Sequence, residues 1–260
     1  MKKIMFVISF LVAIVACTTD EASLNLSNNN NNNSTTSANQ QNTGSSANDL
    51  LSDATYTSML IELVYVEGFE PSQTAINNFV AFLEARTFKP NGITVEKRAI
   101  ASPGNAPYTN TEIRAIEDAN RTAYNTENQI TVWAFFADGA SANNTSEGVV
   151  LGTAYRNTSF VIYEETIHGY SDSALEPSRS LLETTVITHE FGHLLGLTNL
   201  GTDLQSDHED ATHPKHCNEE NCLMYYAAET GDGIANLITG GSAPQLDAQC
   251  IADLQANGGK

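Results

Sequence analysis

Two histidines and a glutamate occur at a spacing that can bind a metal ion and activate water. The run His189-Glu190-Phe191-Gly192-His193 places its histidines four residues apart. In a helix this is about one turn, so both imidazoles lie on one face and can reach one metal. Glu190 lies between them and can take a proton from a water at that metal. Nitrogen ligands, an open coordination position and a neighbouring base are what catalytic zinc requires, so the motif predicts a zinc hydrolase.

The residues that follow extend the motif. Gly196 completes the pattern HExxHxxG, and a glycine there can end the helix and turn the chain back towards the metal. Further on, His216-Cys217 is followed by Cys222 and Met224 in the pattern HC-x4-C-x-M. Together these residues resemble the metzincin clan of zinc endopeptidases, and the second pattern is similar to that of archaemetzincins. The chain looks closest to lipid-anchored bacterial metalloproteases. The resemblance implies His216 as the third zinc ligand and Met224 as the residue of the Met-turn.

The chain departs from the metzincin pattern in the segment between the glycine and the third ligand. Asn199 occupies the usual position of that ligand, and residues 198–215 form an inserted loop. Asparagine is a poor zinc ligand, so we expect Asn199 to hold the turn after the helix through its side chain. The loop carries Asp203, Asp207, His208, Glu209, Asp210 and His213. Three interpretations stay open: a solvated acidic loop, a Ca²⁺ site within residues 203–210, or His208 or His213 as the third zinc ligand.

Four further expectations concern residues around this region. In some metzincins a tyrosine two residues after the Met-turn methionine points at the metal, which implies that Tyr226 stabilises the oxyanion. Archaemetzincins hold a second zinc through a later CxxC pair, whereas only Cys250 follows here, so we expect one catalytic zinc. In an exported protein the cysteines favour a disulfide over a thiolate metal site. Cys217 and Cys222 are the close pair, but the sequence leaves the pairing open. His168 lies outside the histidine cluster, and we expect it to be structural.

Alternating strands and helices must position these residues. Hydrophobic spacing predicts strands over 57–66, 93–100, 129–137, 148–155 and 159–166, and helices over 71–86, over 111–124 with Thr111 as N-cap, and from about Ser178 into the histidine motif. This order predicts an α+β fold, a single domain over residues 51–260 with a mixed, mostly parallel sheet. The metzincin resemblance implies an active-site helix carrying HExxH, a small C-terminal subdomain with a Met-turn, and residues 148–155 as the edge strand that binds substrate.

The first fifty residues predict export and anchoring. Lys2 and Lys3 precede an apolar run over residues 5–16, which is shorter than the roughly 20 residues that span a bilayer. Residues 1–16 are therefore typical of a signal peptide. Their end resembles a bacterial lipobox, which implies that Cys17 is lipidated. Residues 17–50 are polar and rich in asparagine, so we expect a flexible tether. These features place the protein outside the cytoplasm, in a bacterial cell envelope, held at the membrane by a lipid anchor only.

Charge and motif together limit the classes of function. The chain has 31 acidic and 12 basic side chains, with a formal net charge of -19, which repels phosphate backbones and excludes nucleic-acid binding. We expect a monomeric zinc endopeptidase that hydrolyses protein or peptide substrates. Two alternatives stay open. Because of Asn199, one is a zinc-binding lipoprotein of the cell envelope, a binding module or adhesin, that does not cleave. The other is a surface adhesin whose histidines are incidental and which holds no stoichiometric metal.

Overall fold

The computed structural model describes residues 36–146, 148–171, 173, 176–231, 234 and 241–260. The predicted signal peptide, Cys17 and the tether as far as residue 35 lie outside these ranges. Over the ranges that are described, no helix combines the length and the apolar character needed to cross a membrane.

A five-stranded sheet forms the centre of the fold. Its strands lie in the order β2-β1-β3-β5-β4, and every neighbouring pair is parallel except β4 and β5, which are antiparallel. The segment predicted as an edge strand therefore does lie at an edge, as β4. The predicted mixed, mostly parallel sheet is confirmed. The bounds are β1 (Ser58–Val66), β2 (Ile93–Ile100), β3 (Gln129–Phe136), β4 (Gly152–Arg156) and β5 (Ser159–Ile162).

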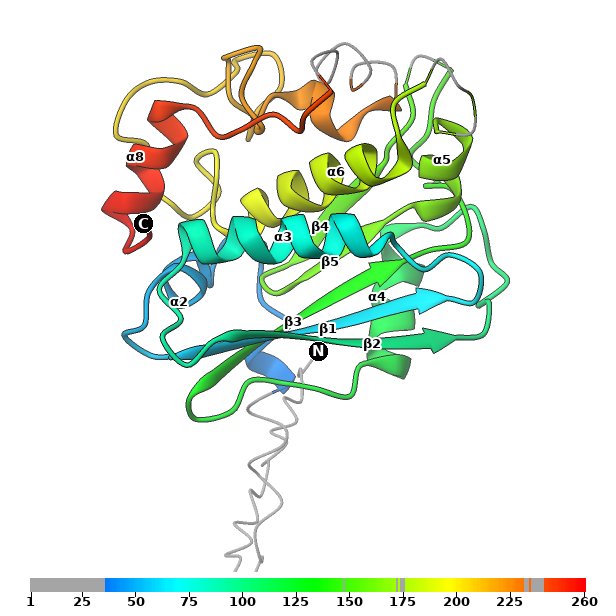
Figure 1. Cartoon of the computed structure of the whole chain (residues 1–260), viewed down its shortest axis with the longest axis horizontal. Helices are drawn as coiled ribbons and strands as arrows, with labels where there is room; N and C mark the ends of the chain where they lie inside the picture. The colour runs from blue at the N-terminus through cyan, green and yellow to red at the C-terminus, as the bar shows by residue number, and fades with distance from the viewer. Residues whose placement is uncertain (1–35, 147, 172, 174–175, 232–233, 235–240) are drawn as a thin grey trace, which may run out of the picture.

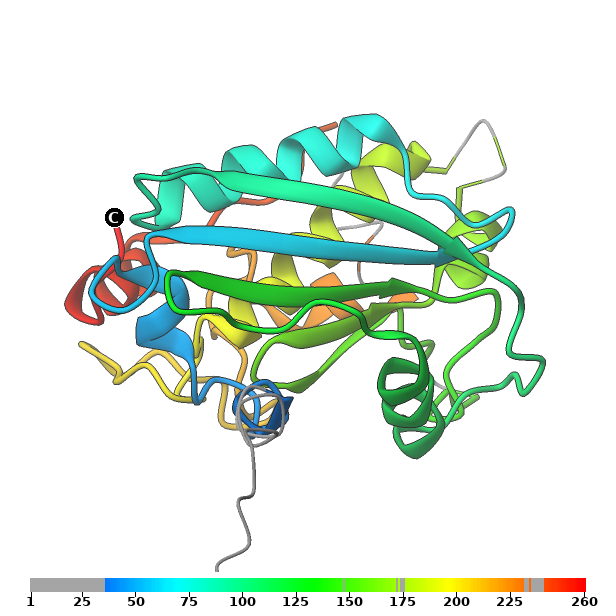
Figure 2. The same ribbon diagram turned by 90° about the horizontal axis from the view of Figure 1, so that it is seen from below.

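Side chains alternate between the two faces of the sheet and build two cores. In β1, Ile61 belongs to the core under α3 (Gln73–Arg86) and α6 (Arg179–Leu194), which run side by side over one face (Figure 1). Val64 belongs to the core under α4 (Asn110–Asn120), which packs on the opposite face (Figure 2). This alternation follows from the two-residue period of a strand. The C-terminal residues lie over α6, on the side away from the sheet (Figure 1).

Several predicted boundaries are wrong by a few residues. The N-cap of α4 is Thr109 and not Thr111: its hydroxyl accepts from the Glu112 N–H, and the Glu112 carboxylate accepts from the Thr109 N–H. This reciprocal capping box satisfies two helix donors that Thr111 would leave unpaired. The last predicted strand ends at Ile162, where α5 (Glu164–Gly169) begins. The helix α8 (Ala248–Ala256) was not predicted.

The predicted start of the folded domain at residue 51 is also wrong, because residues 36–50 belong to it. Leu50 is fully buried in α2 (Ala47–Leu51). Asn39 is fully buried as well, and its side-chain amide donates to the Asn125 side chain and to the Thr131 carbonyl. Asparagine-rich composition indicated a tether, but a buried amide with these partners loses little on leaving water.

Candidate metal centre

The helix α6 presents two histidines whose rings are fixed by backbone carbonyls. The Nδ1 atom of His189 lies 2.7 Å from the Leu223 carbonyl oxygen, and that of His193 lies 3.1 Å from the Leu197 carbonyl oxygen. Both side chains are buried. A carbonyl that accepts from Nδ1–H fixes the tautomer, so the Nε2 lone pair is available to a metal.

His216 completes a cluster of three imidazoles. Its ring centroid lies 5.4 Å from that of His189 and 5.1 Å from that of His193. The metal-binding atoms of the cluster lie within 4.8 Å of one another. Nε2 of His189 and both ring nitrogens of His216 are buried without a hydrogen-bond partner. Buried polar atoms of this kind are costly unless something binds them, so the site fits a metal ion.

Burial keeps the α6 histidines neutral. It lowers the pKa of His189 to about 3 and that of His193 to about 4. Neutral imidazole is the form that binds a metal, so at pH 7 protons do not compete for these two positions.

Glu190 lies under the edge strand beside this cluster. A Cβ atom at Gly152 in β4 would be 2.7 Å from Cγ of Glu190, so only a glycine lets the strand pass over this side chain. Glu190 is fully buried. Burial and the negative charge of Glu229 raise its pKa well above the usual range for a carboxyl. A carboxylate with a raised pKa, close to a metal site, suits a general base.

Met224 is fully buried beneath the histidines. A Cβ atom at Gly192, which precedes His193, would lie only 2.3 Å from the Met224 sulfur. The glycine therefore allows the methionine to pack directly against the helix between its two histidines. The assignment of Met224 as the Met-turn residue stays a prediction.

The structure places Tyr226 away from its expected position. Its ring stacks on His213 with the centroids 3.6 Å apart. The residue of the short 3-10 helix η1 (Tyr226–Glu229) that reaches the cluster is Glu229 instead, whose Oε1 lies 3.4 Å from Nε2 of His216. Burial would raise the pKa of Glu229, but the facing imidazoles of His216 and His189 lower it to about 2. Glu229 could not be identified from the sequence, because no known spacing rule applies to it.

A small cleft opens onto the cluster. It has a volume of about 230 Å³. Its wall includes Thr153 and Ala154 of the edge strand, and Thr43 reaches it from the N-terminal segment, where its hydroxyl donates to the Ala154 carbonyl over 3.4 Å. The other lining residues are Glu190, His193, Leu200, Lys215, His216 and Glu229. The cleft therefore borders the edge strand, Glu190 and two residues of the histidine cluster, His193 and His216.

The inserted loop is held to the end of α6 by Asn199. This residue has a left-handed φ of 56°, and its side-chain amide donates to the Glu209 carboxylate over 2.9 Å. The other Glu209 oxygen accepts from the Lys215 N–H over 2.8 Å. Asp210 lies 2.8 Å from His213, which keeps His213 out of the histidine cluster. Asn199 therefore holds the turn as expected, and calcium binding by the loop stays a prediction.

A second group of candidate ligands lies apart from the first. Cys217, Cys222 and Cys250 are free and buried, so the expected disulfide is absent among these residues. The Cys222 and Cys250 sulfurs are 3.6 Å apart, and Nδ1 of His208 lies 3.4 Å from the Cys217 sulfur and 4.0 Å from that of Cys250. Ligands at zinc distances of about 2.3 Å for sulfur and 2.0 Å for nitrogen are separated by roughly 3.5 to 3.8 Å. The ligand atoms of His208, Cys217, Asp247 and Cys250 lie within 4.8 Å of one another, and Cys222 lies beside Cys250. We name these five residues the cysteine cluster, and His189, His193 and His216 the histidine cluster.

The surroundings of Cys222 favour a thiolate. The Cys222 sulfur accepts from the backbone N–H groups of Met224 and Asp247, each over 3.4 Å. Sulfur contacts with Cys217 and Cys250 and these N–H groups lower the Cys222 pKa to about 4, although burial opposes this. Nε2 of His208 lies 2.7 Å from the Asp253 carboxylate, the outer contact that commonly orients a metal-binding histidine. The sequence missed this cluster because its members come from the inserted loop, the Met-turn region and α8.

Two other features carry no comparable chemistry. His168 belongs to α5, where its ring stacks on Phe69 and lies 3.2 Å from the Glu164 carboxylate, so it stays a structural residue.

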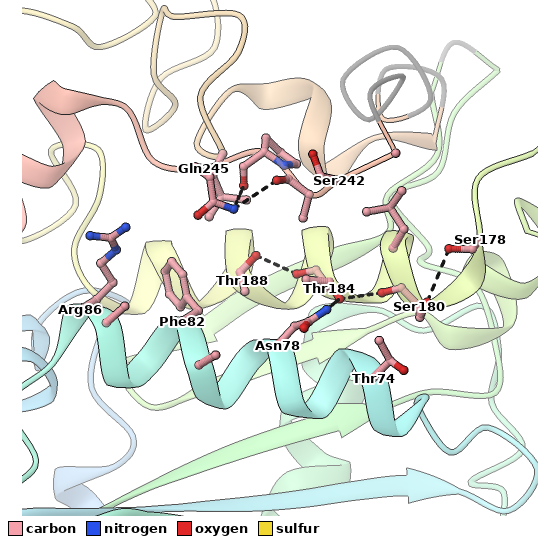
Figure 3. A pocket seen from close by; sticks show the side chains of 17 residues that line it. Thr74, Asn78, Phe82, Arg86, Ser178, Ser180, Thr184, Thr188, Ser242 and Gln245 are labelled. Carbon is pink, nitrogen blue, oxygen red and sulfur yellow. Dashed lines mark hydrogen bonds between the residues drawn. The ribbon is translucent and has the colours of Figure 1, made fainter.

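A larger hollow of about 550 Å³ lies between α3, α6 and residues 241–245 (Figure 3). Asn78 and Thr184 are hydrogen-bonded on its floor. Among the described residues that line the hollow, Arg86 is the only charged one.

One solved structure has a fold similar to that of this chain. Archaemetzincin from Methanopyrus kandleri is 18% identical in sequence, with a TM-score of 0.50, and the match covers 77% of this chain and 96% of that one. The metzincin-like fold expected from the sequence is therefore confirmed, at an identity that establishes the fold alone.

Two other solved structures are less similar. A zinc-dependent peptidase from Methanocorpusculum labreanum is 16% identical, with a TM-score of 0.44 and coverage of 75% of this chain and 99% of that one. Metalloproteinase-II from Bacteroides fragilis is 14% identical, with a TM-score of 0.38 and coverage of 78% and 54%. At these TM-scores we base no conclusion on them. No protein-family model and no curated protein matches the chain.

Proposed function

We propose that this protein is a zinc-dependent endopeptidase whose metal is held by the histidine cluster. One observation carries the proposal: buried histidine nitrogens without hydrogen-bond partners converge beside Glu190, in a cleft walled by an edge strand. A zinc site with three protein nitrogens keeps a position for water, which is what hydrolysis needs. The archaemetzincin-like fold supports the same activity.

Zinc, Glu190 and two backbone carbonyls have separate roles in the proposed reaction. When bound, zinc would polarise the attacking water and the scissile carbonyl. Glu190 takes a proton from the water and passes it to the leaving amine, for which its raised pKa suits it. The Leu223 and Leu197 carbonyls hold the two α6 imidazoles in the tautomer that binds metal. The oxyanion role expected of Tyr226 would require its ring to leave His213.

The substrate is a protein or peptide bound in an extended form. A peptide can add to the outer edge of β4 through main-chain hydrogen bonds, with the Thr43 hydroxyl giving up the Ala154 carbonyl. Thr153 and Ala154 in the cleft wall are the residues of that edge nearest the metal site. The net charge of -19 disfavours nucleic acid as a partner.

The cysteine cluster is proposed as a second, structural zinc site. Its three cysteines and His208 are buried, Asp247 is within reach of the same point, and none of these residues lines the cleft at Glu190, which fits a closed tetrahedral site. His208 supplies the position that the missing cysteine of the CxxC pair leaves open. The single zinc expected from the sequence thus becomes two.

The cellular location and the oligomeric state of the protein are proposed from the sequence alone. Residues 1–16 as a signal peptide and Cys17 as a lipidated residue would place the peptidase, as a monomer, at the outer side of a bacterial membrane. The alternative of a zinc-binding protein that does not cleave gains no support from Asn199, since this residue contacts Glu209.

Cleavage by a variant without the base tests the proposal. Glu190→Gln should keep zinc bound and lose nearly all cleavage of a mixed peptide library followed by mass spectrometry. Glu220→Gln, in an exposed loop, is the matched control and should cleave as the parent does. If Glu190→Gln cleaves as fast as the parent, the proposed role of Glu190 is wrong. If the zinc-loaded parent cleaves no peptide, the protein is the binding alternative.

A further inference from the structure

Glu229 shares the metal-binding position of the histidine cluster. Its Oε1 lies 3.4 Å from Nε2 of His216, and its Oε2 lies 3.8 Å from Nε2 of His189. With the three histidines it forms a group of four ligand atoms within 4.8 Å of one another. The inference drawn from this contact rests on the proposed zinc site.

The distances fit co-ligands better than an ion pair. A charged hydrogen bond between imidazole and carboxylate is about 2.7 to 2.9 Å long. Two ligand atoms of a tetrahedral zinc, each at roughly 2.0 to 2.1 Å, are about 3.3 to 3.4 Å apart. Nε2 of His216 makes no hydrogen bond, although the Glu229 carboxylate is its close neighbour. Both groups therefore face a common point.

The backbone of Glu229 is fixed while its side chain can move. Its carbonyl accepts from the Leu151 N–H over 2.9 Å, one residue before the edge strand, and Thr230 pairs with Val150. The side chain is 28% exposed at the cleft, whereas that of Glu190 is fully buried beneath β4. A glutamate in this setting can turn towards the metal site or out into the cleft without any change in the fold.

We propose that Glu229 is a fourth protein ligand of the histidine-bound zinc and leaves it when a peptide binds. Four protein ligands leave no position for water or for the scissile carbonyl. The resting site is then closed, and the bound peptide has to displace the carboxylate. The two glutamates of the cleft have separate roles: Glu190 moves protons, and Glu229 opens and closes the metal position.

Cadmium-113 NMR of the cadmium-loaded protein tests the ligand set directly. A nitrogen-rich site and a thiolate-rich site give well-separated resonances, so both clusters are seen in one spectrum. Glu229→Gln should shift the resonance of the histidine cluster and leave that of the cysteine cluster unchanged, which also shows that the variant is folded. Glu220→Gln should change neither. An unshifted histidine-cluster resonance in Glu229→Gln would overturn the inference.

A second measurement tests whether Glu229 occupies the fourth position of the metal. Glu229→Ala should weaken zinc binding at the histidine cluster about tenfold or more in competition with a chelator. It should also bind acetohydroxamate, a small metal ligand, more tightly than the parent, because no carboxylate has to be displaced. Equal acetohydroxamate affinity in parent and variant would contradict the gating role. If the histidine cluster holds no zinc at all, the parent itself would show no histidine-cluster resonance, and this result is distinct from a failure of the Glu229 role.

Discussion

The histidine cluster and the cysteine cluster are built from similar numbers of buried donors but differ in access. The histidine cluster borders a cleft of about 230 Å³, and several of its nitrogens have no hydrogen-bond partner. In the cysteine cluster, Cys222 accepts from two backbone N–H groups and His208 is held by Asp253. Free lone pairs beside an open cleft are typical of catalysis, whereas donors fixed from every side are typical of a structural metal.

The largest effect is expected on stability, when a cysteine of the cysteine cluster is replaced. Cys222→Ser should lower the free energy of unfolding by about 3 to 5 kcal/mol, because a structural metal contributes directly to folding. For a domain of this size that corresponds to roughly 10 °C in the thermal midpoint, measured by calorimetry.

The same experiment has an internal control. A strong chelator should lower the midpoint of the parent by a similar amount and that of Cys222→Ser by much less. An equal chelator effect in both proteins would show that the cysteine cluster holds no stabilising metal.

The next largest effect is expected from a substitution that disturbs Glu190 beside the histidine cluster and leaves the cysteine cluster unchanged. Gly152→Ala would put a Cβ atom 2.7 Å from Glu190, so the base has to move. A shift of about 1 Å in a catalytic group can cost roughly a hundredfold in rate, so kcat on a library peptide should fall by about that factor. Zinc content should stay at the parental level, and a loss of zinc together with kcat would contradict the separation.

A smaller effect is expected from a pair of buried glutamates that belong to neither cluster. The buried Glu183 and Glu164 face each other, and burial, followed by this neighbouring charge, raises the pKa of Glu183 to about 7. A raised carboxyl pKa gives stability below about pH 4.5 that is lost as pH rises to about 7. Glu183→Gln should therefore stabilise the protein by about 2 kcal/mol at pH 8 and by little at pH 4.5.

Thermal unfolding with and without chelator checks this. The gain in Glu183→Gln should be the same in both conditions, because neither glutamate belongs to a metal cluster. A gain that requires zinc would tie this pair to the histidine cluster on the same helix.

The sequence predicted most of the site because its chemistry is local. Histidines four residues apart on a helix need no tertiary information, and hydrophobic spacing located all five strands to within a few residues. His216 followed from resemblance to a known pattern. His208 was weighed as a zinc ligand but for the wrong cluster, since its contact with Cys217 depends on how the inserted loop folds back.

Other features could not be predicted, since tertiary contacts decide them. Glu229 reaches the histidine cluster through the pairing of its backbone with Leu151, far away in the sequence. Asn39 lies in a segment whose composition indicates disorder, yet it is buried by contacts with Asn125 and Thr131. Composition and spacing carry no information about such partners.

The zinc content of the purified chain and of His216→Ala, measured by native mass spectrometry, tests the central claim most directly. The account predicts two zinc ions in the parent and one in the variant, which should keep the zinc of the cysteine cluster. Two zinc ions in both proteins would contradict the assignment of His216. A parent without zinc, even after zinc is supplied, would contradict the proposed peptidase itself.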